Sequence, residues 1–336
     1  LEAAGNTVVP FSMKQPQTLD SQYAKYFVSD MDLAHPENIG VLKKIQSAGR
    51  MIYSVQAKKQ MQLLIDDIGH VDVAHLHNIY HHISPSILPV LKKAGASIVM
   101  TLHDYKLISP NYSLFHHGEI HEENATGWFM SCLGQKCMKD SYTQSAVVTA
   151  EMIWHHKIMR YYERYIDKFI TPSQYVMDIC IRHGWPKEKF VHIPNPIDMR
   201  GFSLQEHDDG YVAYVGRLSE EKGVNVLLEA IKQTPDIQYR IVGDGPKRAE
   251  FESYVKKEQM TNVHFDGFLS GDKLKVAIAN ARVLVVPSIW YENYPYSVLE
   301  PMAMGKIVIG SNIGGIPEQL PEALLFPPHD AVALAK

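Results

Sequence analysis

Two cations flank a glycine-bounded turn in the second half of the chain. The run Gly216-Arg217-Leu218-Ser219-Glu220-Glu221-Lys222-Gly223 follows an apolar stretch that is predicted to be a strand, Tyr211–Val215. Arg217 offers a planar fork of donors, Lys222 offers a point charge, and a helix starting after the turn would add free backbone N–H groups. The combination suits a diphosphate. The alternative is a solvated loop with two ordinary surface charges.

A second set of polar groups lies further along, in Ser288-Ile289-Trp290-Tyr291-Glu292-Asn293-Tyr294-Pro295-Tyr296-Ser297-Val298-Leu299-Glu300. Pro295 suits the first turn of a helix. That placement leaves Glu292 in the preceding loop and puts Glu300 about a turn and a half inside the helix. The two carboxylates would then reach different parts of one ligand, while the N–H groups around Asn293 and Tyr294 would face a phosphate.

Two further strand ends carry candidate residues. The turn Val242-Gly243-Asp244-Gly245-Pro246 has glycines that would let the backbone approach a flat ligand, although such turns are common between a strand and a helix. His103 follows the apolar run Ser97–Leu102, and a lone histidine there is usually structural. Both positions matter because ligands of open parallel sheets bind at the carboxyl ends of strands.

The elements that must position these residues alternate in type along the whole chain. Short β-rich runs separated by helical periodicity predict doubly wound parallel sheets with crossover helices. The expected strands are Val71–Leu76, Ser97–Leu102, Lys168–Thr171, Phe190–Ile193, Tyr211–Val215, Tyr239–Val242, Val263–Phe265, Val283–Val286 and Ile307–Gly310. The expected helices are Gln56–Ile68, Ile87–Ala94, Glu151–Ile166 and Gln174–Arg182, with four more beginning at Val224, Pro246, Gly271 and Tyr294.

A proline-rich stretch divides the chain into two expected domains. Pro194 and Pro196 fix their own φ angles and restrict their predecessors, so neither a helix nor a central strand can continue through them. We therefore expect an N-terminal domain over residues 1–195 and a C-terminal domain over residues 196–336. The segment from about residue 105 to 145 is rich in Gly, His, Asn and Cys and is expected to be an insertion or a lid.

Composition narrows the class of protein. The 336 residues are 46% hydrophobic and 21% charged with a formal net charge of -4, which is ordinary for a globular enzyme and does not favour nucleic acid as a partner. Three cysteines, Cys132, Cys137 and Cys180, are too few for a disulfide scaffold and favour a reducing compartment. No apolar run is long enough to cross a bilayer and the first residues lack a signal-peptide pattern, so a cytoplasmic location is expected.

In combination, the motifs resemble a known family. The loop from Gly216 to Gly223, the glutamates Glu292 and Glu300 with seven residues between them, and the following Gly314-Gly315-Ile316-Pro317-Glu318 are similar to family 4 retaining glycosyltransferases of the bacterial surface-polysaccharide type. The resemblance covers roughly residues 70 to 327. It implies the α/β fold called GT-B, in which two Rossmann-like, doubly wound domains face each other across a cleft.

The resemblance also implies roles for individual residues. Gly216, Arg217 and Lys222 would hold the diphosphate of a UDP- or GDP-linked sugar, with help from backbone amides near Asn293 and Tyr294. Glu300 would accept hydrogen bonds from the ribose hydroxyls, and Glu292 would lie near the transferred sugar. The remaining assignments are a nucleobase pocket lined by Gly243 and Phe268, and His103 facing the donor sugar from the N-terminal domain.

The expected enzyme is a hexosyltransferase that acts on a glycan or a polyisoprenyl-linked acceptor. The motif set offers no obvious carboxylate nucleophile and no Asp-x-Asp metal motif, so front-face departure of the diphosphate without a catalytic metal or cofactor is expected, with Arg217 and Lys222 stabilising the leaving group. Two alternatives remain: a sugar-nucleotide epimerase on the same fold, and a non-catalytic sugar-nucleotide-binding protein. The family's first strand with its glycine-rich loop and its closing C-terminal helix are expected to be missing, which puts activity of this chain in question.

Three weaker patterns complete the expectations. The polar groups after Val71–Leu76, which are His75, His77, Asn78, Tyr80, His81 and His82, suit either an acceptor site or a solvated loop. Cys132, Cys137 and His121 are candidate ligands of a structural zinc, but the short cysteine spacing favours no metal. Lys92-Lys93 and Tyr161-Tyr162-Glu163-Arg164-Tyr165 suit peripheral contact with the inner face of the plasma membrane, although ordinary helix surface is favoured.

Overall fold

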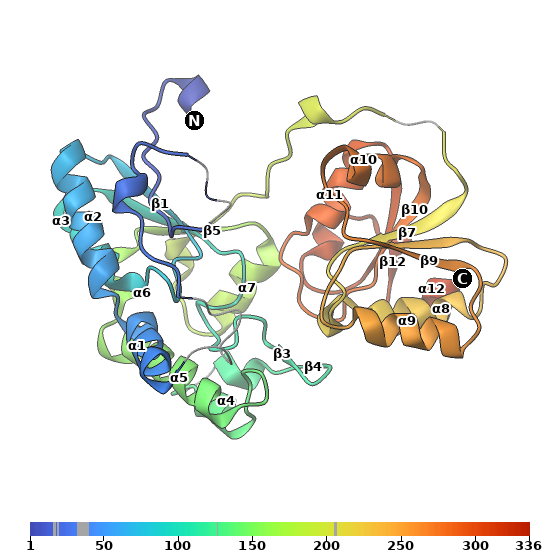
Figure 1. Cartoon of the computed structure of the whole chain (residues 1–336), viewed down its shortest axis with the longest axis horizontal. Coiled ribbons are helices and arrows are strands. Elements are labelled where there is room, and N and C mark those ends of the chain that lie inside the picture. The colour runs from blue at the N-terminus through green and yellow to red at the C-terminus, as the bar shows by residue number, and fades with distance from the viewer. Residues whose placement is uncertain (16–17, 19, 32–39, 126, 205–206) are drawn as a thin grey trace. The chain divides into compact units, whose positions relative to one another are not determined.

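The computed structural model describes residues 1–15, 18, 20–31, 40–125, 127–204 and 207–336, and only the backbone of residues 41–43. The chain divides into two compact units (Figure 1). The first comprises residues 1–112, 123–171 and 183–191, and the second comprises residues 113–122, 172–182 and 192–336. Two short segments from the first half of the sequence therefore belong to the second unit.

The first unit is built around a parallel sheet with the strand order β1-β2-β5-β6. The strands are β1 Val73–His77, β2 Ser97–Thr101, β5 Lys168–Thr171 and β6 Phe190–His192. The central strand β2 buries Ile98 and Met100 completely, and these two side chains lie on the same face of the sheet. The helices are α1 Val41–Ile52, α2 Val55–Ile68, α3 Leu88–Lys93, α4 Met130–Gly134, α5 Tyr142–Met152 and α6 Tyr161–Tyr165.

One predicted helix of this unit is wrong in its extent. The helix expected over residues 151–166 is broken into the end of α5, a π-helical turn at Ile153–Ile158, and α6. The break lies at Arg160, whose φ of 51° is left-handed and cannot continue a right-handed helix.

The second unit contains a six-stranded parallel sheet with the order β12-β11-β10-β7-β8-β9. The strands are β7 Tyr211–Val215, β8 Tyr239–Val242, β9 Val263–Gly267, β10 Ala281–Val286, β11 Ile307–Ser311 and β12 Leu325–Phe326. Renumbered from the first strand of the unit, the order is that of the dinucleotide-binding sheet, in which the chain reverses its direction of winding between β7 and β10. The expected doubly wound fold is confirmed here at the level of strand order.

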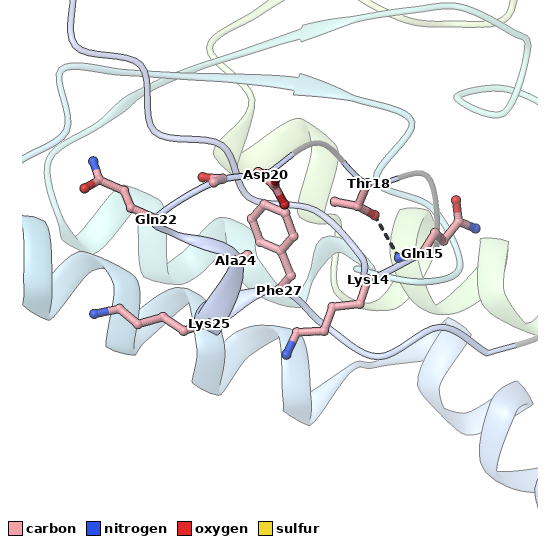
Figure 2. Close-up of a pocket in the computed structure, with 9 residues that line it drawn as sticks. Lys14, Gln15, Thr18, Asp20, Gln22, Ala24, Lys25 and Phe27 are labelled. Carbon is pink, nitrogen blue, oxygen red and sulfur yellow. Dashed lines mark hydrogen bonds between the residues drawn. The ribbon is translucent and has the colours of Figure 1, made fainter.

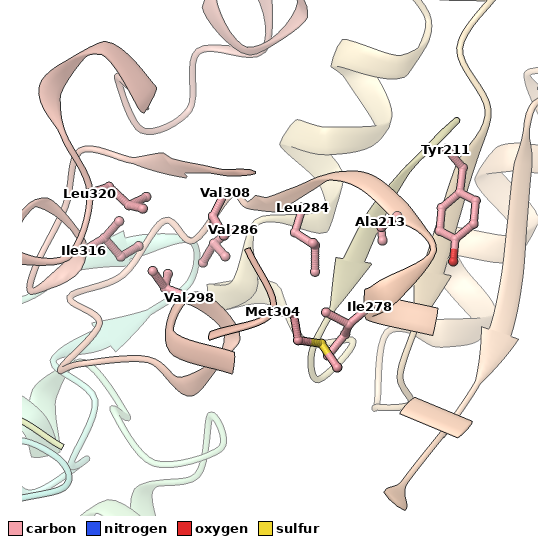
Figure 3. Packing of buried hydrophobic residues seen from close by; sticks show 11 residues of the cluster. Tyr211, Ala213, Ile278, Leu284, Val286, Val298, Met304, Val308, Ile316 and Leu320 are labelled. Atoms are coloured by element: carbon pink, nitrogen blue, oxygen red, sulfur yellow. The ribbon is translucent and has the colours of Figure 1, made fainter. Parts of the chain in front are cut away.

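Helices cover both faces of this sheet. They are α8 Val224–Ile231, α9 Arg248–Lys257, α10 Gly271–Ala279, α11 Tyr296–Ala303 and α12 Ala331–Ala335. On one face, Ile278 of α10 and Val298 of α11 pack with Leu284 and Val308 of the sheet (Figure 3). On the other face, residues of α8 pack with Ile241 and with Phe251 of α9. Helices α9 and α11 each begin two residues later than expected, at Arg248 and Tyr296, and Pro295 caps α11.

The segment expected to be an insertion contributes to both units. A short hairpin of β3 Phe115–His116 and β4 Glu119–Ile120 belongs to the second unit, whereas α4 and the start of α5 belong to the first. The second unit also includes α7, Gln174–Arg182, whose bounds are those predicted.

Candidate functional site

The strand order of the second unit points to one edge of its sheet. In open parallel sheets a crevice forms at the carboxyl ends of the two strands between which the winding reverses, because their crossover helices leave to opposite faces. Those strands are β7 and β10. The loops that follow them are residues 216–223 and 287–295, which contain most of the residues singled out from the sequence.

Lys222 and Glu292 meet at this edge. The Nζ of Lys222 donates to Oε1 of Glu292 at 2.7 Å, and the Oγ of Ser288 donates to the same oxygen at 2.6 Å. The Lys222 ammonium also lies 5.0 Å from the centre of the Trp290 ring, which is within the range of a cation–π contact. The lysine predicted to hold a diphosphate is therefore paired with the glutamate predicted to lie near the sugar.

Burial makes this pair strong. The Glu292 side chain is 6% exposed and that of Lys222 is 25% exposed. Burial raises the pKa of the Glu292 carboxyl, but the charge of Lys222 and the hydrogen bonds from Lys222 and Ser288 outweigh it and leave the pKa below its ordinary value of 4.5. Glu292 is thus ionised at neutral pH, and one face of Lys222 remains open to an anion.

Arg217 and Gly216 form the other end of the same loop. The Arg217 side chain is exposed, and its carbonyl oxygen accepts a hydrogen bond from the hydroxyl of Tyr214 at 2.8 Å. The backbone N–H of Gly216 donates to the carbonyl of Val242 at 3.0 Å. The guanidinium is therefore carried by a fixed backbone but is itself available to a ligand.

Glycines bring the loops at this edge into direct backbone contact. Gly243 has a φ of 144°, and a Cβ there would lie 1.8 Å from the carbonyl oxygen of Gly216. A Cβ on Gly315 would lie 1.7 Å from the carbonyl oxygen of Asn293, and the Gly315 N–H donates to the carbonyl of Glu292 at 2.7 Å. Because no other residue fits at these two positions, the glycines set the spacing between the loops.

The remaining polar candidates of the second unit lie on the loop and helix that follow β10. The Oδ1 of Asn293 accepts a hydrogen bond from the Oγ of Ser173 at 3.2 Å, and the carbonyl of Tyr294 accepts one from the side chain of Asn195 at 3.0 Å. Glu300 lies inside α11 and is partly exposed. Its partial burial raises its pKa, and the charge of Lys275 opposes this shift.

Phe268 differs from the other candidates in its environment. It directly follows β9 and its side chain is 74% exposed, so it lies on the surface. Gly243, its expected partner in a nucleobase pocket, lies at the end of β8, next to β9 in the sheet. An exposed aromatic ring at this edge of the sheet is accessible for stacking on a base.

His103 belongs to the first unit, where it follows β2 and joins a cluster with His75 and His77, which lie within β1 and not after the strand as expected. Its Nε2 is 2.8 Å from Nδ1 of His77, and the Nε2 of His75 is 2.7 Å from the hydroxyl of Thr101. Desolvation, and then repulsion from His75 and His103, lowers the pKa of His77 to about 4. Desolvation and His75 also lower the pKa of His103. The cluster is therefore neutral at pH 7 and offers hydrogen bonds rather than charge.

A buried ion pair, which the sequence patterns did not indicate, fixes the loop that follows His103. The Nζ of Lys106 donates to Oε2 of Glu151 at 2.8 Å, and both side chains are almost completely buried. The backbone N–H of Lys106 also donates to Oδ1 of Asp104 at 2.9 Å, while burial raises the pKa of Asp104 to about 6. Helix α5 thereby anchors the strand end that carries the histidine.

Sequence reasoning missed further residues in the second unit. The role of Ser288 was not foreseen, although it lies in the quoted motif. Glu318 was used only as part of a motif, but its carboxylate accepts from the backbone N–H groups of Gln174 and Tyr175, both at 2.7 Å. It therefore caps the first turn of α7. A glutamate following a glycine pair was a visible signal, but its distant partner was not.

The two cysteines considered as zinc ligands are paired with each other. The Sγ atoms of Cys132 and Cys137 are joined in a disulfide, so neither thiolate remains for a metal, and the expectation of unpaired thiols fails for this pair. Cys180 is a buried free thiol in α7, and burial raises its pKa well above the ordinary range.

Two other features lie outside this site. A hollow in the first unit is formed by residues between Lys14 and Phe27, and no predicted site residue lines it (Figure 2). Among the described residues, no helix combines the length and the apolar character that are needed to cross a membrane.

Sequence comparisons identify the family to which the chain is similar. Residues 1–200 match the family described as Glycosyltransferase Family 4, and residues 198–336 match that described as Glycosyl transferases group 1. Over 171 residues the chain is 32% identical to the putative colanic acid biosynthesis glycosyltransferase WcaL of Escherichia coli (strain K12), covering 46% of this chain and 42% of WcaL. Over 193 residues it is 33% identical to the sulfoquinovosyl transferase of Arabidopsis thaliana, covering 52% of this chain and 37% of that protein. The chain thus spans less than half the length of these relatives.

Comparisons with solved structures identify the fold. Sucrose-phosphate synthase from Thermosynechococcus elongatus aligns with a TM-score of 0.62 at 22% identity, over 97% of this chain and 77% of that one. HepE of Anabaena, solved in complex with UDP-glucose, aligns with a TM-score of 0.59 at 16% identity, over 97% of this chain and 87% of HepE. The two parallel α/β sheets thus have the GT-B fold.

Proposed function

Because the chain belongs to glycosyltransferase family 4, we propose that it transfers a hexose-type sugar from a nucleoside diphosphate sugar to a glycan or lipid-linked acceptor, with retention at the anomeric carbon. The observation that carries this proposal is the Lys222–Glu292 pair at the edge where the winding of the second sheet reverses. A cation for the diphosphate and a carboxylate for the sugar lie side by side there.

The donor assignments follow from the chemistry of each group. Arg217 and Lys222 bind the diphosphate, Glu300 accepts hydrogen bonds from the ribose, and Phe268 stacks on the base above the backbone of Gly243. A UDP-linked donor is favoured, since HepE was solved with UDP-glucose. The similarity to WcaL supports a role in assembling a surface polysaccharide.

The reaction breaks the bond between the anomeric carbon and the diphosphate oxygen. Both electrons of that bond leave with the diphosphate, whose growing negative charge Arg217 and Lys222 stabilise. The acceptor hydroxyl oxygen forms the new bond on the same face of the sugar, and its proton passes to the departing phosphate oxygen. Glu292 orients the sugar.

Separate roles for the two glutamates provide the test. Glu300→Ala should weaken binding of free UDP about tenfold by removing a charge-assisted hydrogen bond to the ribose, whereas Glu292→Gln should leave UDP binding unchanged and reduce sugar transfer at least tenfold. Calorimetry gives the binding constants, and chromatography of UDP-sugar reactions with and without an acceptor gives the transfer rates.

The matched control is Glu250→Gln, which removes an exposed partner of Lys247 on α9 and should change neither quantity. An equal loss of UDP binding in both glutamate variants would contradict the division of roles. If the chain forms an epimeric sugar nucleotide in the absence of any acceptor, its reaction is epimerisation and not sugar transfer.

A further inference from the structure

A segment far away in the sequence packs against the loop that carries Glu292. The β3–β4 hairpin, residues 113–122, is part of the second unit. Phe115 of the hairpin forms a buried cluster with Val226 of α8 and Ile289, and Ile120 and Trp290 pack against it. The hairpin therefore contacts the same Trp290 whose ring faces the ammonium of Lys222.

A hydrogen bond also joins the hairpin segment to the loop that carries Glu292. The hydroxyl of Tyr291 donates to Oε1 of Glu122 at 2.8 Å. The other oxygen of Glu122 is 3.5 Å from the guanidinium of Arg182 at the end of α7, and the Tyr291 ring lies 4.9 Å from the ring of Tyr175 in the same helix. Glu122 is only 29% exposed, so its hydrogen bond is partly shielded from water.

Two neighbouring residues of the loop form hydrogen bonds with different segments of the chain. The side chain of Tyr291 donates to Glu122, whereas the backbone carbonyl of Glu292 accepts a hydrogen bond from the N–H of Gly315. Small displacements of reacting groups have large effects on rate, because transfer requires a near-attack geometry. The Tyr291–Glu122 hydrogen bond is therefore one of the contacts that hold the loop next to Glu292.

We propose that Glu122 and Tyr291 form a latch, the Glu122–Tyr291 hydrogen bond, by which the hairpin positions Glu292 for sugar transfer. The proposal rests on the function assigned above and gives a specific contact to a segment that was expected to be an insertion or a lid. Both are positioning residues, because they act through the backbone of the loop.

Tyr291→Phe tests the latch by removing one hydroxyl and keeping the ring contacts. Backbone amides of residues 288–294 should then exchange with deuterium at least threefold faster, because the local opening of the loop becomes easier. In donor turnover, kcat should fall about tenfold while the dissociation constant of UDP stays within twofold. Glu122→Ala, which removes the acceptor, should have a similar effect. The double variant should be no worse than Glu122→Ala alone, since that variant already lacks the contact that Tyr291→Phe removes.

Tyr254→Phe is the matched control, because Tyr254 also donates to a glutamate, Glu229, in the same unit but on α8 and α9. It should alter neither exchange at 288–294 nor kcat. Unchanged exchange in Tyr291→Phe, additive losses in the double variant, or a loss of UDP binding in place of kcat would each overturn the latch. If the parent chain turns over no donor, the proposed function fails, and exchange at 288–294 still decides whether the latch orders the loop.

Discussion

At the scale of single residues, the contact with the clearest measurable consequence is the pair formed by Lys222 and the buried carboxylate of Glu292. Arg217, Lys222, Glu292 and Glu300 were identifiable because charged groups follow strands of an alternating pattern. The 2.7 Å contact between Lys222 and Glu292 joins residues that are 70 positions apart, and no local pattern encodes such a contact.

The acid dependence of stability should depend on this pair. The pKa of Glu292 is lowered in the folded chain, so the unfolded chain binds the proton more readily, and the stability from the ionised carboxylate is present above pH 4.5 and lost as the pH falls through the folded pKa. Glu292→Gln should lower the free energy of unfolding by about 2 kcal/mol at pH 7, because it leaves Lys222 partly buried without its partner.

Urea unfolding between pH 3 and pH 7 measures the free energy of unfolding of the parent chain and of Glu292→Gln as a function of pH. The difference between the parent chain and Glu292→Gln should shrink below pH 4.5. The control Glu250→Gln, in which the carboxylate is 63% exposed, should follow the parent at all pH values. A constant difference between the Glu292→Gln and parent curves across the range would show that the carboxylate gains nothing from ionisation in the folded state.

At the scale of helices and strands, the periodicity of the sequence predicted most of their bounds. It did not predict to which of the two units each segment belongs. Strands such as Tyr211–Val215 and Tyr239–Val242 have the predicted bounds, because apolar runs between turn residues are local signals. The hairpin at residues 113–122 was seen only as part of an insertion. Its membership of the second unit depends on Phe115 and Ile120 finding apolar partners more than a hundred residues away.

Glu318 gives α7 its place in that unit. Its two oxygens accept the N–H groups of Gln174 and Tyr175, which no helical carbonyl can satisfy. Glu318→Gln leaves one acceptor oxygen and removes the negative charge from the positive end of the helix dipole, so the free energy of unfolding should fall by about 1 to 2 kcal/mol.

Amide exchange should localise that loss, with faster exchange at Gln174 and Tyr175 in the variant. Glu322→Gln serves as the control, because Glu322 is exposed at the start of a short 3-10 helix nearby in the sequence. If both substitutions lower stability equally, the capping role of Glu318 is wrong.

At the scale of the whole molecule, the doubly wound pattern was sufficient to predict two parallel sheets, and the strand order that locates the site came only from the structure. Periodicity reports which face of an element is buried but not which strands are neighbours. The strand order β12-β11-β10-β7-β8-β9 places motifs that are far apart in the sequence at one edge of the sheet. The disulfide between Cys132 and Cys137 was likewise invisible, since composition alone favoured free thiols.

The central claim is that this edge binds a nucleoside diphosphate sugar, and a calorimetric panel tests it most directly. UDP, GDP and ADP, both free and sugar-linked, would be titrated into the parent chain and into the Arg217→Ala variant. Because the Arg217 side chain is exposed, its removal should not affect folding. We predict selective binding of one nucleotide, weakened at least tenfold in Arg217→Ala. Absence of binding to every nucleotide, or equal binding by the variant, would contradict the assignment of this edge as the donor site.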